Sequence, residues 1–390
     1  MYIPSGIDLL KTVWRYPRYF SHLLAKKIAL RRRFSLAEDA GGDDGKVPLP
    51  LLFKLYLTFK CNLRCGMCMY WGDKGVFCGK APMEAGGELA WDVVQGLFRQ
   101  TAGYHPSFIL SGGEPLLYSK FADLLRLCKR AGCFAEICTN GLLLDKFFDV
   151  ISDNPYVSFY LSLDGTGAIN DALRGQGVYD KVVNNIKRLK SLDKPPYLGI
   201  QFTLQPENVS VLYDTCAKMV DLGVNWFFIN LRWYLSDSQV DGYRKVMRDD
   251  FNLQARSQEG YHNSYQDKFD KDEFVRQCRK IQSKRWPIQV SSFLKKPEDI
   301  YDYIDKPEKY QYCRFCYKQW FRMDVMPNAD VACCNQFPDL AMGNLGRASV
   351  GDLWNSRSFF DFRRFIRGRL LPVCSRCYAL YLYDDKRKHL

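Results

Sequence analysis

The stretch LLFKLYLTFKCNLRCGMCMYW, residues 51–71, joins a strand-like run to three closely spaced cysteines. The apolar run 51–58 is predicted as a β-strand, and Cys61, Cys65 and Cys68 follow directly after it. In a parallel sheet, side chains just beyond the strands gather at the carboxyl edge, where such sheets place their chemistry. A structural zinc site prefers four ligands, and a disulfide uses two thiols. The rest of the sequence must therefore show whether these three thiols form a zinc knuckle, a disulfide knot or a site that needs a vacant coordination position.

Composition narrows the class of protein. The 390 residues are 47% hydrophobic and 25% charged, with 15 cysteines and a formal net charge of +13. This predicts a folded chain with acidic or anionic partners. The N-terminal segment is interrupted by Lys11, Arg15 and Arg18, so it does not resemble a cleaved signal peptide, and no apolar run is long enough to span a bilayer. We therefore expect a cytoplasmic protein whose reduced, clustered thiols bind metal.

Strand and helix signals alternate between residues 50 and 231. This rhythm predicts an α/β fold, a partial (β/α)6 TIM-like barrel, with a small C-terminal iron–sulfur cluster-binding extension. The predicted strands are 51–58, 107–111, 134–138, 156–163, 198–204 and 226–231. Four regions are expected: 1–49 as a basic segment and linker, 50–231 as the core, 232–312 as bridging helices and loops, and 313–390 as the cluster-binding module.

The N-terminal segment is strongly basic. Phe20, Leu23, Leu24 and Ile28 could share one face of a helix there. Such a helix either lies on an anionic membrane surface, contacting it through residues 1–36, or docks on the protein's own body with its basic side in water. The sequence leaves both alternatives open.

Polar, glycine-bearing motifs end the next three predicted strands. SGGEP (111–115), TNG (139–141) and SLDG (162–165) all fall at the edge that also receives the cysteines. Over residues 51–231 this pattern resembles the radical S-adenosylmethionine (radical SAM) superfamily. The resemblance implies that Cys61, Cys65 and Cys68 hold three irons of a [4Fe–4S] cluster and that the fourth, open iron binds the amino and carboxylate groups of SAM. Met67 stands where many members have an aromatic residue.

The same resemblance implies a set of SAM contacts. The backbone and acid of the GGE motif would receive the SAM amino group, with glycine allowing close approach of the backbone to the ligand. Gln201, Thr203 and Asn230 are weaker candidates, for which simple packing is an equal alternative. The expected cofactor-binding residues are Gly112, Gly113, Glu114, Pro115, Thr139, Asn140, Ser162, Asp164 and Arg174.

The C-terminal segment resembles the SPASM-type extension of radical SAM proteins. It has CxxxW (316–320), VACC, GNL (343–345), LWNS (353–356) and a closing CxxC. The resemblance implies one auxiliary [4Fe–4S] cluster on Cys316, Cys334, Cys374 and Cys377, with Cys334 favoured because it lies three residues after Val331. Cys313 and Cys333 are alternates, and a zinc ribbon is the competing interpretation of this spacing. Cys78, shortly after the first cluster loop, is a weak further candidate.

The implied function is reductive cleavage of SAM to a 5′-deoxyadenosyl radical that abstracts hydrogen from a substrate. No catalytic side chain is assigned. A small-molecule, lipid or sugar-linked substrate is favoured, with a peptide as the alternative, and a non-catalytic iron–sulfur carrier or scaffold is the alternative of another class. A flavodoxin or ferredoxin is the expected reductant, and nucleic acid is not an expected partner. Peripheral contact with the inner face of the membrane is one of the two alternatives for the basic N-terminus.

Overall fold

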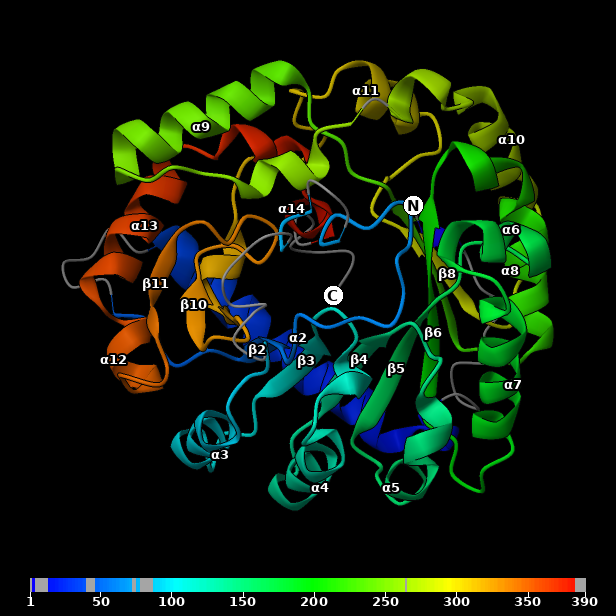
Figure 1. Ribbon diagram of the computed structural model, residues 1–390, viewed down its shortest axis with the longest axis horizontal. Helices are drawn as coiled ribbons and strands as arrows, with labels where there is room; N and C mark the ends of the chain where they lie inside the picture. Colours follow the sequence, from blue (N-terminus) through cyan, green and yellow to red (C-terminus); the bar gives the residue numbers. More distant parts are fainter. Residues whose placement is uncertain are drawn as a thin grey trace.

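Seven parallel strands form the centre of the protein. The computed structural model describes residues 2–3, 13–39, 46–71, 75–77, 87–263 and 265–382. Strands β2 to β8 lie side by side in chain order and form a curved sheet (Figure 1). Their bounds are β2 (Leu52–Tyr56), β3 (Ser107–Ser111), β4 (Ala135–Thr139), β5 (Val157–Ser162), β6 (Tyr197–Leu204), β7 (Trp226–Leu231) and β8 (Gln289–Ser292). The first six match the predicted strands, so the α/β architecture predicted from the sequence is confirmed.

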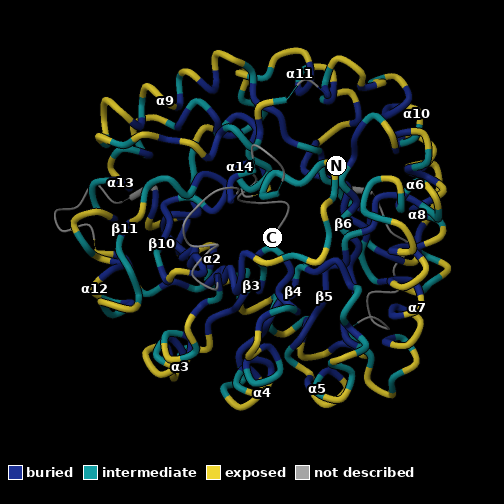
Figure 2. The backbone as a smooth tube through the Cα atoms, in the orientation of Figure 1, coloured by how far each residue is buried: buried dark blue, intermediate teal, exposed yellow. Residues whose placement is uncertain are grey.

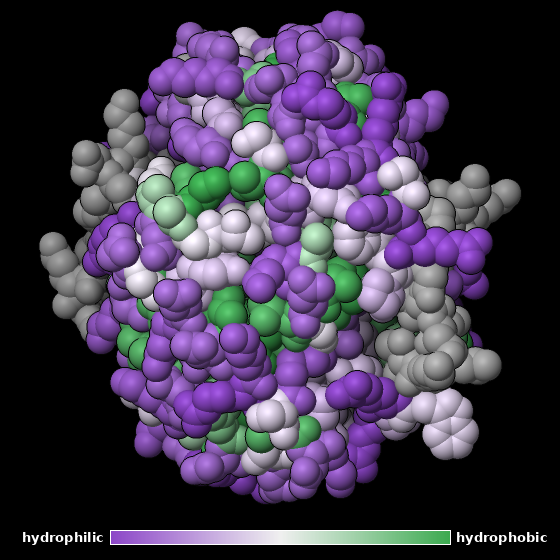
Figure 3. All heavy atoms as spheres, turned by 90° about the vertical axis from the view of Figure 1, so that its right-hand side faces the viewer, coloured by the Kyte–Doolittle hydropathy of each residue, from purple (hydrophilic) through white to green (hydrophobic). Residues whose placement is uncertain are grey.

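Helices cover the outside of this curved sheet. The connecting helices are α3 (Trp91–Gln100), α4 (Phe121–Ala131), α5 (Phe148–Ser152), α6 (Gly167–Arg174), α7 (Val178–Lys190) and α8 (Leu212–Asp221). Each crossover places an apolar helix face on the sheet, so the strands are buried and the outer helix surfaces are exposed (Figure 2). On the side of α7 and α8, hydrophilic side chains cover most of the surface (Figure 3).

The bridging region holds more than helices and loops. It contains α9 (Asp237–Phe251), α10 (Lys271–Gln282) and α11 (Asp299–Asp305), and it also supplies β8, which pairs in parallel with β7. The prediction of helices and loops alone was therefore wrong at this strand. The run IQVSS is short and follows a polar helix, so its pairing depends on the β7 edge rather than on local pattern.

The C-terminal module continues the same sheet. Its first strand, β9 (Arg322–Val325), pairs in parallel with β2, and β10 (Asp330–Ala332) and β11 (Ala341–Asn344) follow in antiparallel order. Helices α12 (Val350–Trp354), α13 (Arg357–Gly368) and α14 (Tyr378–Leu382) complete the module. At the other edge of the sheet, the two-residue strand β1 (Tyr2–Ile3) pairs with β8.

Helix α2 (Pro17–Asp39) lies across the amino-terminal ends of the strands. Tyr19 stacks on Tyr197 with a ring-centroid distance of 4.1 Å, and the Lys26 ammonium group pairs with Glu136 at 2.8 Å. Phe20 and Leu23 pack against the barrel, whereas Leu24 and Ile28 face outward. The four residues therefore do not share one face: aromatic side chains at the strand ends cover Phe20 and Leu23, and this side of α2 docks on the protein's own body.

None of the described helices is long and apolar enough to cross a membrane.

Candidate functional site

Three thiols gather in the loop after β2. A backbone hydrogen bond of 3.0 Å from Cys68 N–H to the Cys65 carbonyl forms a tight turn, and Leu63 N–H donates to Cys61 Sγ at 3.4 Å. Burial, together with nearby negative charge on Glu114, Cys65 and Cys68, raises the pKa of Cys61 to about 11. The three predicted ligands thus lie in one loop, close enough for Cys65 and Cys68 to influence the pKa of Cys61. Cys78 lies outside the described residues.

The two glycines of the GGE motif allow contact with the cysteine loop. A Cβ on Gly112, which has φ +142°, would lie 2.4 Å from the Thr58 carbonyl oxygen, and one on Gly113 would lie 2.3 Å from the Lys60 carbonyl oxygen. Gly113 N–H donates to Thr58 at 2.8 Å. These glycines are therefore needed for one loop backbone to approach the other.

The Glu114 carboxylate is occupied by the protein's own groups. It accepts hydrogen bonds from Leu116 N–H at 3.1 Å, the Thr139 hydroxyl at 2.6 Å and Asn140 N–H at 2.9 Å. Burial raises its pKa to about 7 despite these three donors. In the described structure this acid therefore fixes the loops after β3 and β4. Pro115 begins the short, buried helical turn that follows it.

Asn140 connects the loop after β4 to the cysteine loop. Its Nδ2 donates to Asn62 Oδ1 at 2.8 Å, and its own Oδ1 accepts from Leu142 N–H at 3.0 Å. Sequence analysis did not single out Asn62, and its only signal was its position beside Cys61. This hydrogen bond therefore holds the thiol-bearing loop against the TNG motif.

Arg174 lies between a buried carboxylate and a thiol. Its Nη2 is 2.6 Å from Asp164 Oδ2, and its Nη1 donates to Cys65 Sγ at 3.9 Å. Asp164 also accepts from Thr203 N–H at 2.7 Å. Burial raises the pKa of Asp164, although the positive charge of Arg174 lowers it. Burial lowers the pKa of Arg174, but the neighbouring Asp164 carboxylate and Cys65 thiol outweigh this effect, so its pKa is raised and the guanidinium stays charged. A guanidinium at this place favours thiolate at Cys65.

The remaining predicted residues lie towards the carboxyl ends of the strands. Ser162, Gln201, Thr203 and Asn230 are half-buried, and strand register places Ser162 beside Gln201 and Thr203 beside Asn230. The Oδ1 atom of Asn230 is buried and has no hydrogen-bond partner among the described residues. A buried acceptor of this kind fits a ligand that carries donors, such as SAM or a substrate.

A small cavity lies beside Cys68. Its volume is about 120 Å³, and residues that follow β7 form one wall. Sequence analysis missed these residues because they lie beyond the last predicted strand. They include Arg232, Trp233, His262 and Asn263.

Four C-terminal thiols line one apolar cavity. They are Cys316, Cys334, Cys374 and Cys377, whereas Cys313 and Cys333 are absent from the lining. Burial raises the pKa of Cys374 well above its ordinary value, and negative charge on Cys377, Cys316 and Cys334 contributes to this increase. Burial, together with negative charge on Cys334 and Cys316, raises the pKa of Cys377 to about 12. Among the described residues, no three His, Cys, Asp or Glu side chains are arranged to hold a metal ion. We interpret these four thiols as surrounding a space rather than converging on one ion.

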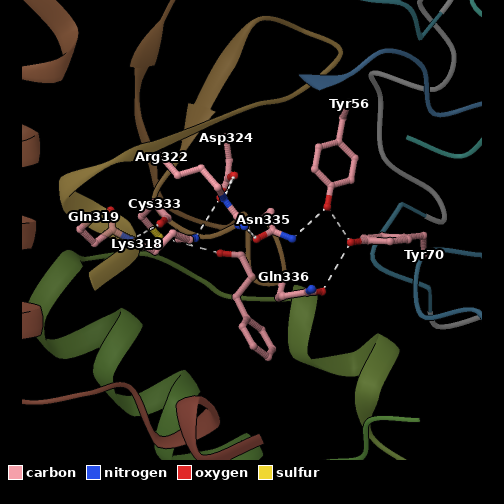
Figure 4. A network of polar contacts seen from close by, with 10 residues as sticks. Tyr56, Tyr70, Lys318, Gln319, Arg322, Asp324, Cys333, Asn335 and Gln336 are labelled. Atoms are coloured by element: carbon pink, nitrogen blue, oxygen red, sulfur yellow. Dashed lines mark hydrogen bonds and ion pairs between the residues drawn. The ribbon is translucent and has the colours of Figure 1, made fainter. Parts of the chain in front are cut away.

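Hydrogen bonds join the two thiol sites (Figure 4). Tyr70, two residues after Cys68, shares a 2.8 Å hydrogen bond with Tyr56, and Asn335 Nδ2 donates to the Tyr56 hydroxyl at 3.0 Å. Gln336 Oε1 accepts from Tyr261 at 2.7 Å and from Tyr70 at 3.5 Å. Asn335 and Gln336 directly follow Cys334, so both cysteine loops contact one polar wall.

Two family descriptions match the chain. The Radical SAM superfamily matches residues 55–219, and an iron–sulfur cluster-binding domain, SPASM, matches residues 313–378. Together they cover the two thiol sites described above.

Curated relatives match over different lengths. Pre-heme d1 synthase of Dinoroseobacter shibae is 31% identical over 179 residues, which are 45% of this chain and 41% of that protein. The tungsten-containing aldehyde ferredoxin oxidoreductase cofactor-modifying protein of Pyrococcus furiosus is 23% identical over 83% of this chain and 86% of its own length. The chain thus spans less than half the length of the first relative.

Solved structures share the fold. Streptococcus suis SuiB bound to S-adenosylmethionine superposes with a TM-score of 0.58 and 16% identity, covering 81% of this chain and 68% of SuiB. The enzyme anSMEcpe with bound AdoMet gives a TM-score of 0.56 and 15% identity over 86% of this chain and 91% of that one.

Proposed function

We propose that this chain, a member of the radical SAM superfamily with a SPASM-type C-terminal domain, is an enzyme that abstracts hydrogen from a substrate. When bound, SAM and a [4Fe–4S] cluster supply the chemistry, which is reductive formation of a 5′-deoxyadenosyl radical. One observation carries the proposal: the GGE motif, the TNG motif and Arg174, which pairs with Asp164 of the SLDG motif, bond to the described segment that bears three thiols or to the residues just before it.

In this proposal Cys61, Cys65 and Cys68 hold three irons, leaving one iron for SAM. Soft, anionic thiolates suit iron–sulfur ligation. Gly112, Gly113, Glu114, Thr139 and Asn140 fix the loops around that site, as their contacts with one another and with the cysteine loop support. Ser162 and Asn230, near the carboxyl ends of β5 and β7, are the proposed ligand contacts.

Cys316, Cys334, Cys374 and Cys377 are the proposed ligands of one auxiliary [4Fe–4S] cluster. The shared cavity supports this set over the alternates. Cys313 Sγ instead donates to the Phe315 carbonyl at 3.2 Å, and Cys333 Sγ faces the Phe337 carbonyl at 3.9 Å. Four protein ligands leave no open iron, which favours a role in electron transfer or structure over substrate ligation.

A small-molecule, lipid or sugar-linked substrate remains our proposal, with a peptide as the alternative. The relatives' names include both kinds: pre-heme d1 synthase on one side, and SuiB bound to a precursor peptide on the other. A low-potential electron donor such as flavodoxin or ferredoxin is the proposed reductant, because the cluster must be reduced before each cleavage.

The test is anaerobic reconstitution with iron, sulfide, SAM and dithionite, followed by chromatographic assay of 5′-deoxyadenosine. Even without substrate, the wild-type chain should release it slowly, and the Cys65→Ala variant should release none. The Cys313→Ala variant, altered outside both proposed ligand sets, is the matched control and should behave as wild type. Absence of 5′-deoxyadenosine from a wild-type protein that holds its clusters would favour the non-catalytic carrier.

We further propose that the outer face of α2 contacts an anionic membrane surface. Trp14, Leu24, Ile28 and Leu36 are four of the six exposed large hydrophobic side chains among the described residues. Exposed Arg31 and Arg32 lie among them, and residues 13–37 contain no acidic residue. Apolar and basic side chains together on one helix face suit an anionic headgroup layer.

Vesicle co-sedimentation tests this surface. A variant with Leu24→Gln, Ile28→Gln, Arg31→Gln and Arg32→Gln should lose binding to phosphatidylglycerol-containing vesicles. Arg244→Gln/Arg248→Gln, on the exposed side of α9, is the control and should keep it. Equal binding by both variants, or no binding by wild type, contradicts this proposal without affecting the enzymatic one.

A further inference from the structure

A buried charged group lies at the wall of the cavity that contains four thiols (Figure 4). Asp324, on β9, pairs with the Lys318 ammonium group at 2.9 Å and with Arg322 Nε at 2.7 Å. All three side chains are buried, with 7% or less of each exposed. Asn335 N–H donates to the same carboxylate at 3.1 Å.

The Lys318 ammonium group and the Arg322 guanidinium group both pair with the Asp324 carboxylate. Burial alone would raise the pKa of Asp324, but Arg322 and Lys318 lower it to about 2, so the carboxylate is ionised. Burying ions costs several kcal/mol each unless partners compensate. The pairing therefore holds a charged ammonium group at the wall of the cavity.

The Lys318 side chain shares a cavity with the four thiols. Lys318 lines the cavity together with all four cysteines, and negative charge on Cys334 and Cys316 helps to raise its pKa. Lys318 in turn favours the thiolate form of Cys316. The negative charge of four thiolates exceeds the positive charge of a [4Fe–4S] core. A cluster bound here is therefore an anion, and it becomes more negative on reduction.

We propose that Lys318, held in place by Asp324, is a positioning residue that supplies the positive charge facing the auxiliary cluster and raises its reduction potential. This inference rests on the proposed assignment of the four cysteines. Reduction adds one electron from an external low-potential donor and involves no proton. A fixed cation stabilises the more negative, reduced cluster more than the oxidised one.

Two substitutions should shift the potential in opposite directions. Lys318→Met removes the positive charge of the ammonium group and should lower the ratio of reduced to oxidised cluster at a fixed potential by about tenfold or more. Asp324→Asn removes the negative charge that pairs with Lys318 and should raise that ratio. Lys318→Arg keeps the charge and should restore the wild-type value.

The experiment is a redox titration with dithionite and mediators, monitored by electron paramagnetic resonance. All variants carry Cys61→Ser, Cys65→Ser and Cys68→Ser, so that only the auxiliary cluster contributes signal. Lys309→Met, an exposed lysine paired with Asp302, is the control. If Asp324→Asn does not fold, the comparison of Met with Arg at position 318 remains decisive.

The outcomes separate the two claims. Without any [4Fe–4S] signal in the parent protein, the proposed auxiliary cluster itself fails. A normal signal whose potential is unchanged in Lys318→Met overturns the inference alone. Reduced cluster content at an unchanged potential assigns Lys318 a structural role and also overturns it.

Discussion

At the scale of single residues, the acids of the motifs stabilise the site rather than project into it. Glu114 receives three hydrogen bonds from neighbouring loops, and Asp164 pairs with Arg174 and a backbone N–H. A buried carboxylate must be satisfied, and the closest donors belong to the chain itself. The motifs therefore mark positions where four loops are held together.

Glu114 should make folding stability depend on pH. Its pKa is raised from 4.5 to about 7 by burial, so between these values the folded protein keeps a proton that the unfolded chain has lost. Stability should therefore fall as pH rises from about 4.5 to 7, by about 3 kcal/mol, and then level off. Urea unfolding across this range, in the absence of SAM, measures the slope.

Glu114→Gln should remove this decrease in the free energy of unfolding with rising pH. Glu88→Gln, at a partly exposed ion pair with Lys60, should retain the decrease. Equal slopes in wild type and Glu114→Gln would show that the acid ionises normally in the folded protein.

Arg174→Met should destabilise the fold strongly. The substitution leaves the fully buried Asp164 carboxylate without its ion-pair partner, a change that typically costs about 3–5 kcal/mol. Arg357→Met breaks an exposed pair with Asp361 and should cost about 1 kcal/mol or less. Comparable losses in urea unfolding for both variants would contradict the importance of the buried pair.

At the scale of elements, α2 is a structural part of the barrel. Its inner side buries Tyr16, Tyr19, Leu30 and Phe34, and Arg33 donates to the carbonyls of Pro48 and Leu49. A deletion of residues 1–36 would uncover apolar side chains at the strand ends, so loss of membrane binding in such a deletion would be uninformative. Point substitutions on the outer face avoid this problem.

Phe34→Ala should cost about 3–5 kcal/mol in the free energy of unfolding, because the ring is buried against Tyr317 and Phe321. Leu36→Ala, two residues away and exposed, should change it by about 0.5 kcal/mol or less. A similar effect of both substitutions would mean that α2 does not dock as described.

At the scale of the whole molecule, one continuous sheet joins the two thiol sites. Strand β9 pairs with β2, the strand that leads into the first cysteine loop, and Asn335 and Gln336 bind the tyrosines on the barrel side. The relative position of the two sites is therefore set by backbone pairing and a polar wall rather than by a linker.

A fragment ending at residue 312 should not fold as an independent barrel. It would expose the hydrogen-bonding edge of β2 and the part of α2 that contacts residues 317–320. We expect aggregation, or loss of the near-ultraviolet circular dichroism signal, in the fragment. A soluble fragment with a cooperative thermal transition would show that the two parts are separable.

The sequence by itself determined the six core strands, the motif at the end of each of the first four, and both cysteine sets, because hydrophobic period and residue spacing are local properties. Tertiary structure decided the rest. It added β8, turned half of the expected α2 face inward, and chose Cys316 and Cys334 over Cys313 and Cys333 at the cavity. It also directed Glu114 and Asp164 to partners within the protein. These outcomes depend on contacts between residues far apart in the chain, where burial requires each polar group to find a partner, and no local pattern encodes that choice.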